Sequence, residues 1–304
     1  MTSTSIPDQT RETGQRFDLT SSGQSVLRAF SSALSLLQNG KLAVPLIIYF
    51  ILRLAILKLY LSGIAEPWSS FWALFMRGLT SDQLSRCPAH LVLMPAILGR
   101  FDMVLGVFVQ VIFDGATILL VASAFRKTLP SLKAGFSGAV KKYPHLVGVM
   151  LLASLGILIG TNLPGIIAGH LSWSSRFGIT AAAALLGLVV QALFVYALPL
   201  VLLDRHRTIR GVGESFKIAL HSIIKTFLLV ALPFILTLPT MLLESKAEMI
   251  ALRLSPDFMI YIHVAGEIMQ VISTYLVMGG ATIIFLRIME KTANGRRSNR
   301  QTTV

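Results

Sequence analysis

Six long apolar segments alternate with short polar segments along the chain. Each segment can cross about 30 Å of hydrocarbon as a helix, because a helix rises about 1.5 Å per residue. The pattern therefore predicts an all-α fold, a polytopic membrane helical bundle of about six transmembrane helices. The predicted spans lie near residues 42–64, 102–125, 146–168, 178–203, 222–243 and 264–287.

A second pattern precedes some of these spans. Residues 127–152 align on residues 207–232 at a constant offset of 80, and in both segments a basic connection and a short amphipathic stretch lead directly into a span. A similar stretch, residues 25–37, precedes the first span. The pattern predicts parallel internal repeats, each with one cytoplasmic amphipathic helix and two spans. The repeat units would be 23–125, 126–203 and 204–290. The alternative is that basic amphipathic connections look alike in any multi-pass protein.

Composition supports the membrane prediction. The 304 residues are 54% hydrophobic and 13% charged, with a mean hydropathy of +0.72, whereas about a quarter of the residues of a soluble domain are charged. The net charge of +13 does not indicate a nucleic-acid partner, because the basic residues lie in short connections between apolar segments. The single cysteine excludes an internal disulfide framework.

The distribution of basic residues predicts the orientation. Of the 27 Lys and Arg residues, 19 fall on one side of the predicted spans and 6 on the other. Basic connections stay in the cytoplasm, so both ends are expected there, in a protein of the cell inner (plasma) membrane. Residues 1–22 are expected to be a disordered N-terminal segment and residues 291–304 a basic cytoplasmic tail. Anionic lipids of the cytoplasmic leaflet are expected partners, and a membrane-protein partner or a homo-oligomer is left open.

Two charged residues inside predicted spans are the leading site candidates. Arg53 and Asp114 each lie about 10 residues from the inner ends of their spans, so their similar depths allow an ion pair. A charge at the bilayer centre costs about 3 kcal/mol or more. The pair is expected to lock two helices together, or to form a proton or ion relay with Gln110 and Thr117, which share a helix face with Asp114. At the offset of 80, Asp114 corresponds to Phe194, so its role is specific to one unit.

Three further polar residues share one face of the last predicted span. They are His263, Glu267 and Gln270, spaced four and three residues apart near the outer end of that span. They form either an interfacial polar face or part of a site. The sequence contains no HxxxH or HExxH pattern, no Walker loop and no GxSxG motif. We therefore predict no cofactor, no metal site and no catalytic residue.

One segment carries a family resemblance. Residues 196–236, YALPLVLLDRHRTIRGVGESFKIALHSIIKTFLLVALPFIL, combine a span ending in Pro199, a basic turn, Glu214-Ser215-Phe216 and a following span. This pattern resembles six-span bacterial membrane proteins related to the membrane domain fused to some glycerophosphodiester phosphodiesterases. The resemblance covers about half the chain and implies the six-span architecture. It carries over no functional residue, since the catalytic domain of those proteins has no counterpart here.

Three classes of function remain open at this point. The absence of catalytic motifs favours a non-enzymatic helper or partner subunit in an envelope or lipid-related process. The charges inside the spans favour a small transporter or channel with its path near Arg53 and Asp114. A membrane-embedded enzyme or cofactor-binding protein is the third alternative.

The orientation leads to the first testable prediction. A tag fused after Val304 is expected to resist protease added to intact spheroplasts and to be digested once the inner membrane is permeabilised, because the basic connections hold both ends in the cytoplasm. Digestion of the tag in intact spheroplasts would contradict the predicted orientation.

Overall fold

The computed structural model describes residues 19–62, 89–167, 173–204 and 207–301. Within these ranges the chain is helical apart from short connections and contains no strand, which confirms the all-α prediction. The elements are α1 (Leu19–Leu37), α2 (Gly40–Ser62), α5 (Ala89–Leu105), the π-helix η1 (Gly106–Gln110), α6 (Val111–Phe125), α7 (Leu132–Lys141), α8 (Tyr143–Ile167), α9 (Trp173–Phe194), α10 (Ala197–Leu203), α11 (Thr208–His221), α12 (Ile223–Glu244), α13 (Ala247–Arg253) and α14 (Phe258–Gln301).

Six helical segments are long and apolar enough to cross a membrane, so the chain is a multi-pass membrane protein. They are Gly40–Ser62, Leu91–Phe125, Tyr143–Thr161, Ala181–Leu203, Ile223–Glu244 and Phe258–Lys291. Two of them begin at least six residues earlier than the sequence predicted, at Leu91 instead of residue 102 and at Phe258 instead of residue 264. The apolar stretch of α5 continues the second span outward, so Asp102 lies inside that span and not at its end.

The structure also differs from the predictions for the two terminal segments. Residues 1–18 of the predicted disordered segment lie outside the described residues, whereas residues 19–22 form the first turn of α1. Within the predicted basic tail, α14 continues as one helix as far as Gln301.

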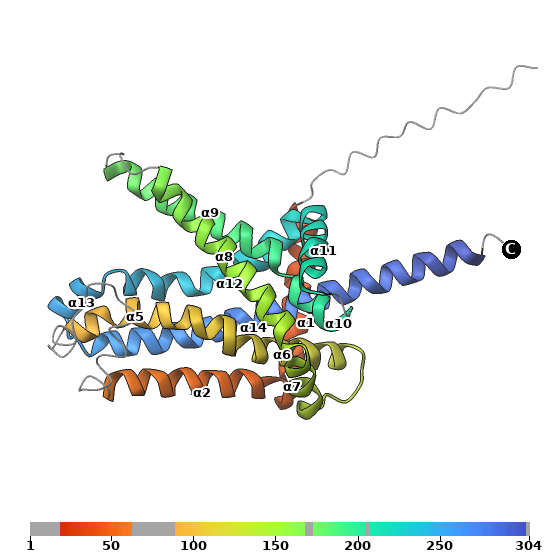
Figure 1. Cartoon of the computed structure of the whole chain (residues 1–304), viewed down its shortest axis with the longest axis horizontal. Coiled ribbons are helices and arrows are strands. Elements are labelled where there is room, and N and C mark those ends of the chain that lie inside the picture. The colour runs from red at the N-terminus through yellow and green to blue at the C-terminus, as the bar shows by residue number, and fades with distance from the viewer. Residues whose placement is uncertain (1–18, 63–88, 168–172, 205–206, 302–304) are drawn as a thin grey trace, which may run out of the picture.

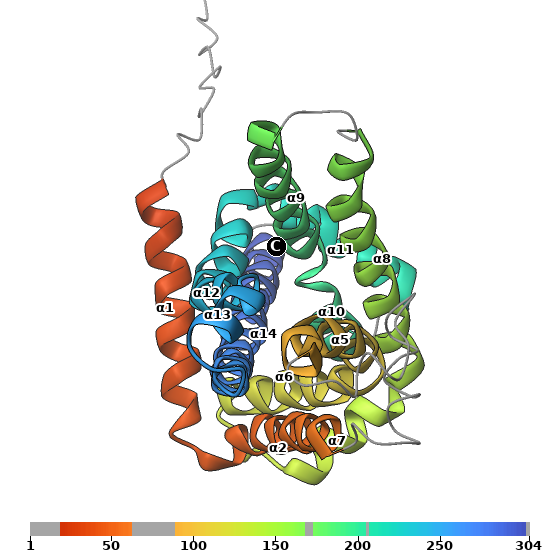
Figure 2. The ribbon, with the colours of Figure 1, turned by 90° about the vertical axis from the view of Figure 1, so that its left-hand side faces the viewer.

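An amphipathic helix directly precedes a span at three places in the chain: α1 precedes α2, α7 precedes α8 and α11 precedes α12. The chain turns at the single residues Lys142 and Ser222 in the second and third cases. The buried residues Gly135 and Ala139 of α7 correspond at the offset of 80 to the buried Ser215 and Ala219 of α11. In α1, which lies across the direction of α2, α12 and α14 in Figures 1 and 2, the face with Ala29 and Ala33 is buried.

The spans pack as a closed ring of three pairs. In each pair the first span contacts its own second span: α2 with α6, α8 with α9 and α12 with α14. It also contacts the second span of the preceding pair: α8 with α6, α12 with α9 and α2 with α14. The second spans are central: 50–56% of the residues in their most apolar stretches are buried, compared with 22–28% in the first spans. The outer ends of α8 and α9 lean away from the other spans in Figure 1.

Each amphipathic helix packs against the second span of the preceding pair: α7 on α6, α11 on α9 and α10, and α1 on α14. Edge-to-face aromatic contacts recur at two of these places, between Phe136 and Phe113 and between Phe216 and Phe194, with ring centroids 5.8 and 5.1 Å apart. At the third, the Tyr275 hydroxyl of α14 donates to the Ala33 carbonyl at 2.6 Å.

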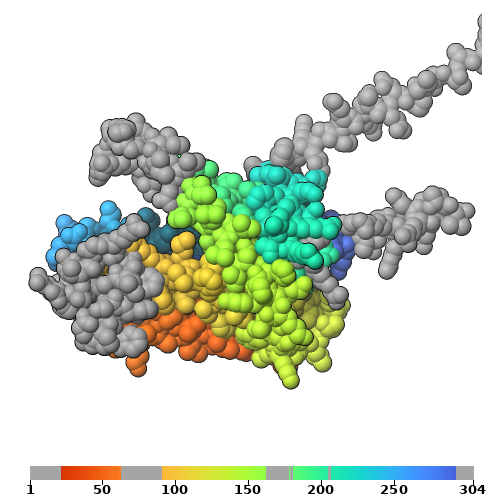
Figure 3. Space-filling model, viewed as in Figure 1, coloured from red at the N-terminus to blue at the C-terminus, as the bar shows by residue number. Residues whose placement is uncertain are grey.

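The second pair is also tied to α11. His145 Nδ1 of α8 lies 3.2 Å from Thr208 Oγ1 of α11, and a Cβ on Gly148 would lie 3.0 Å from Thr208 Cγ2. Figure 3 shows the outer surface of this region, where the yellow-green surface of α8 adjoins the cyan surface of α11.

The junction of α1, α12 and α14 leads to a prediction about stability. A Cβ on Gly280 would lie 2.7 Å from Leu229 Cδ1 and 3.1 Å from Phe30 Cε1. Gly280→Val is therefore expected to lower the free energy of unfolding by about 1–3 kcal/mol through overpacking. The matched control is Gly213→Val in α11, where a Cβ meets nothing within 4 Å. Thermal denaturation in mild detergent measures both variants, and equal midpoints would contradict the packing described here.

Candidate functional site

The structure corrects the predicted Arg53–Asp114 pair. Arg53 of α2 pairs with Asp102 of α5 and Glu267 of α14. Asp114 of α6 is also buried, but its carboxylate meets Gln110 and not the guanidinium. The depth argument overlooked Asp102, because the second span was predicted to start at that residue.

Arg53 is held between two carboxylates. Its Nη2 donates to Asp102 Oδ2, and its Nε lies 2.5 Å from Glu267 Oε2. The second contact is an ion pair whose angle does not suit a hydrogen bond, so both of its atoms remain without a hydrogen-bond partner. The side chains of Arg53 and Glu267 are 9% and 6% exposed, and that of Asp102 is 23% exposed. The ion pairs thus join three helices inside the bundle.

His263 continues this group toward the outer end of the bundle. Its Nε2 lies 3.4 Å from Glu267 Oε1, and its Nδ1 lies 2.9 Å from Glu244 Oε1 at the end of α12. Glu244 is 24% exposed, whereas the imidazole is 8% exposed. We call Arg53, Asp102, Glu244, His263 and Glu267 the outer cluster. Three carboxylates face one guanidinium and one imidazole in this cluster, so it has a deficit of positive charge.

A π-helical segment sets the direction of the polar side chains in the second span. In an uninterrupted α-helix, the twelve steps from Asp102 to Asp114 would place them about 120° apart around the axis. A π turn takes in one extra residue, which reduces this angle to roughly 20°. The π-helix Gly106–Gln110 lies between the two carboxylates, so both can face α2.

A second polar group lies deeper, next to Arg53. The Arg53 guanidinium lies over the Tyr49 ring, 5.7 Å from its centroid. The Tyr49 hydroxyl donates to Gln110 Oε1 at 3.1 Å, and the Gln110 side chain lies close to the Asp114 carboxylate. We call Tyr49, Gln110, Asp114 and Thr117 the inner cluster. It continues the line of polar side chains from the outer cluster into the half of the second span that ends at Phe125.

The inner cluster ends on two atoms without hydrogen-bond partners. Asp114 Oδ2 and Thr117 Oγ1 are buried and unpaired, on side chains of residues only 3% and 2% exposed. An unpaired buried carboxylate oxygen is costly in an apolar environment. A proton or an ordered water molecule at Asp114 Oδ2 would remove this cost.

The remaining sequence candidates divide between the site and the surface. His263 and Glu267 are buried in the outer cluster, whereas Gln270 is exposed and lies outside it. Sequence reasoning missed Asp102 and Glu244, because both fell at predicted span ends. The apolar run from Leu91 to Leu98 was the signal that Asp102 lies inside a span.

The polar groups do not form a metal centre. Glu244 and Glu267 approach opposite ring nitrogens of His263, so they flank the imidazole and do not converge on one point. In the described part of the chain, no three His, Cys, Asp or Glu side chains are grouped to hold a metal ion.

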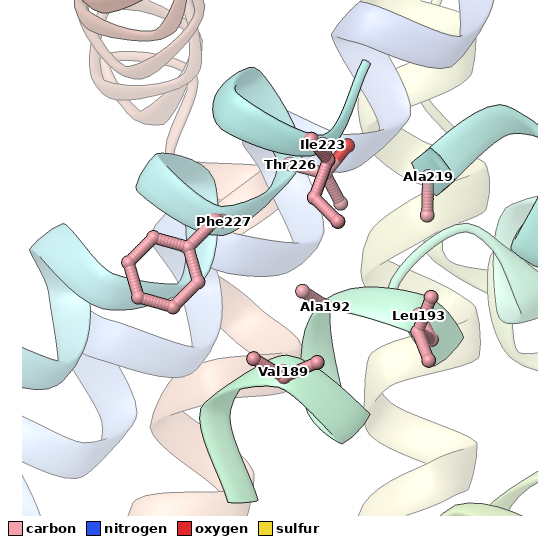
Figure 4. Close-up of a pocket in the computed structure, with 7 residues that line it drawn as sticks. All are labelled: Val189, Ala192, Leu193, Ala219, Ile223, Thr226 and Phe227. Atoms are coloured by element: carbon pink, nitrogen blue, oxygen red, sulfur yellow. The ribbon is translucent and has the colours of Figure 1, made fainter. Parts of the chain in front are cut away.

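A crevice between α9, α11 and α12 is too small for a ligand. It is lined mainly by apolar side chains, among them Val189, Ala192 and Phe227 (Figure 4). Its space of about 20 Å³ is that of roughly one water molecule. We assign no function to it.

The pairing of Arg53 leads to a prediction about stability. Arg53→Gln leaves Asp102 and Glu267 without a cation, so we expect a loss of about 3–5 kcal/mol in the free energy of unfolding. The triple variant Arg53→Gln, Asp102→Asn, Glu267→Gln is expected to recover part of that loss, because it removes the unpaired charges. Lys58→Gln, an exposed position on the same helix, serves as the control and should change stability by less than about 0.5 kcal/mol.

Thermal denaturation in detergent distinguishes these variants. A triple variant no more stable than Arg53→Gln would contradict the assignment of Arg53 as the partner of both carboxylates.

Comparisons with known proteins give no relative on which to base the function. A scan of known protein families, a search of curated proteins and a search of solved structures each found no match. The resemblance of residues 196–236 to the membrane domain of some phosphodiesterases stays a prediction from the residues alone.

Proposed function

We propose that this protein is a small transporter or channel of the inner membrane that carries protons, with both ends in the cytoplasm. The observation behind this proposal is the line of polar groups that runs from the partly exposed Glu244 to the buried Asp114. Polar side chains inside a membrane are costly, and they typically mark ion or proton pathways when they line up between helices.

The outer end of this line is accessible and its inner end is closed. Glu244 and Asp102 are about one quarter exposed, whereas Glu267 and Asp114 are buried. Beyond Asp114, the buried residues Ile118, Leu120 and Val121 fill α6 toward the cytoplasmic end. The arrangement is that of a path open to the outside and blocked by an apolar plug below Asp114.

The deficit of positive charge supports protons as the cargo. Three carboxylates and one imidazole can each accept or release a proton, and Arg53 keeps its own charge. Asp102 and Glu267 contact different nitrogens of the Arg53 guanidinium. A proton can therefore pass from Asp102, which is partly exposed, to Glu267, which is buried. A fixed guanidinium repels any mobile cation, so in this proposal the proton moves between carboxyl and imidazole groups and not as a free ion.

The orientation is part of this proposal. The amphipathic helices α1, α7 and α11 and the end of α14 lie at one end of the bundle (Figure 1), and this end carries most of the basic residues. Basic connections favour the cytoplasm. The outer cluster then lies on the opposite, periplasmic side.

We also propose that the chain consists of three parallel repeats. The recurrence of an amphipathic helix, a peripheral span and a central span supports this proposal, as does the ring of pairwise contacts. The polar clusters draw on α2, α5, η1, α6, α12 and α14. The path therefore lies where the first and third pairs meet, away from the second pair.

Proton flux tests the proposed function. Purified protein in liposomes that contain a pH-sensitive dye is expected to acidify the lumen when a membrane potential, negative inside, is imposed with potassium and valinomycin. Asp114→Asn and Glu267→Gln are expected to reduce this flux to that of protein-free vesicles, because each removes a carboxylate from the path. Glu290→Gln replaces an exposed carboxylate outside both clusters and should leave the flux unchanged.

Equal flux in wild type and Asp114→Asn would contradict the proposed path. A folded wild-type protein without flux, accompanied through purification by a second membrane protein, would instead support the non-enzymatic helper role that the sequence favours. Bound pigment or metal in the purified protein would point to the enzyme or cofactor-binding alternative.

A further inference from the structure

A basic groove lies at the opposite end of the bundle from the outer cluster. It has a volume of about 570 Å³ between α11, the start of α12 and α14. Its lining combines basic and apolar side chains: Lys217, Ile218, His221, Ser222, Lys225, Ile288 and Lys291. Such a mixture suits a ligand with an anionic part and an apolar part.

The groove carries an excess of positive charge. Lys217 Nζ lies 2.9 Å from Glu214 Oε1, so part of its charge is neutralised. Among the described residues, no ion pair involves Lys225 or Lys291. The chain beyond Lys291 contains no acidic residue. Two lysines therefore remain available to an anion.

The groove lies at the level of the lipid headgroups. Lys225 is in the first turn of the span Ile223–Glu244, and Lys291 is the last residue of the span Phe258–Lys291. Ile218 and Ile288 supply apolar surface beside these lysines. Charged side chains at the end of a span, next to apolar surface, are placed where a phosphate group and the start of an acyl chain meet.

We propose that this groove binds the headgroup of an anionic glycerophospholipid, with its phosphate between Lys225 and Lys291 and an acyl chain along Ile218 and Ile288. The site is independent of the proposed proton path. Its ligand is a lipid and not a soluble phosphate, because the groove lies at the membrane interface and its lining includes the apolar side chains of Ile218 and Ile288.

Native mass spectrometry of the full chain in mild detergent tests the site, with phosphatidylglycerol and phosphatidylcholine as probes. The wild-type protein is expected to retain one phosphatidylglycerol and no phosphatidylcholine. Lys225→Gln with Lys291→Gln is expected to weaken phosphatidylglycerol binding about tenfold or more, because each lysine contributes electrostatic attraction to the anionic headgroup. The matched control, Lys141→Gln with Lys142→Gln, removes two charges from the corresponding turn of the second pair and should keep the lipid.

Equal lipid loss in both double variants would overturn the proposal, since it would indicate diffuse attraction to basic surface. Displacement of the lipid by millimolar inorganic phosphate would also overturn it and assign the groove to a soluble anion. Thermal denaturation without added lipid checks that both double variants are folded. Lys291→Gln alone, at an exposed position, provides a milder variant, and unchanged lipid retention in it and in the double variant would overturn the proposal as well.

Discussion

A charge inside hydrocarbon must be neutralised by a partner, and this constraint organises the outer half of the bundle. Arg53 meets Asp102 of α5 and Glu267 of α14, so helices from the start and the end of the chain are joined at one point. Apolar side chains such as Leu57, Met94 and Ile262 pack around these helices. They lower the local dielectric around Arg53 and Glu267, which strengthens the ion pairs and raises the cost of losing any one partner.

The other half of the bundle is held together by a different means. There, small residues on the amphipathic helices let them lie close against the central spans, as Gly135 and Ala139 of α7 do on α6. Lipid provides little hydrophobic drive for contacts between helices, so close packing and hydrogen bonds such as Tyr275 to Ala33 carry more of the stability. Each amphipathic helix links one pair of spans to the preceding pair, which closes the ring.

The two proposed sites lie at opposite ends of α12. Glu244 at one end of this helix contacts His263, and Lys225 at its other end lines the basic groove. Both sites also draw on α14, which carries Glu267 and Lys291. One helix pair therefore presents acidic groups at one end of the bundle and basic groups at the other. The proposed orientation places the basic end at the cytoplasmic leaflet, which basic residues prefer.

Local properties of the sequence determined the all-α class, the six spans and the amphipathic helices before them, because apolar length and periodicity depend on neighbouring residues only. They also singled out Arg53, Asp114, His263 and Glu267 as polar groups inside spans. The partner of Arg53 depended on the tertiary structure, for two physical reasons. The extra turns of α5 carry Asp102 into the bundle, and the π segment Gly106–Gln110 turns Asp102 and Asp114 toward α2. The longer span could have been recognised from the apolar run Leu91–Leu98. The local change of helical register does not follow from hydropathy, and neither does the choice of partner for Arg53, which brings together helices distant in the sequence.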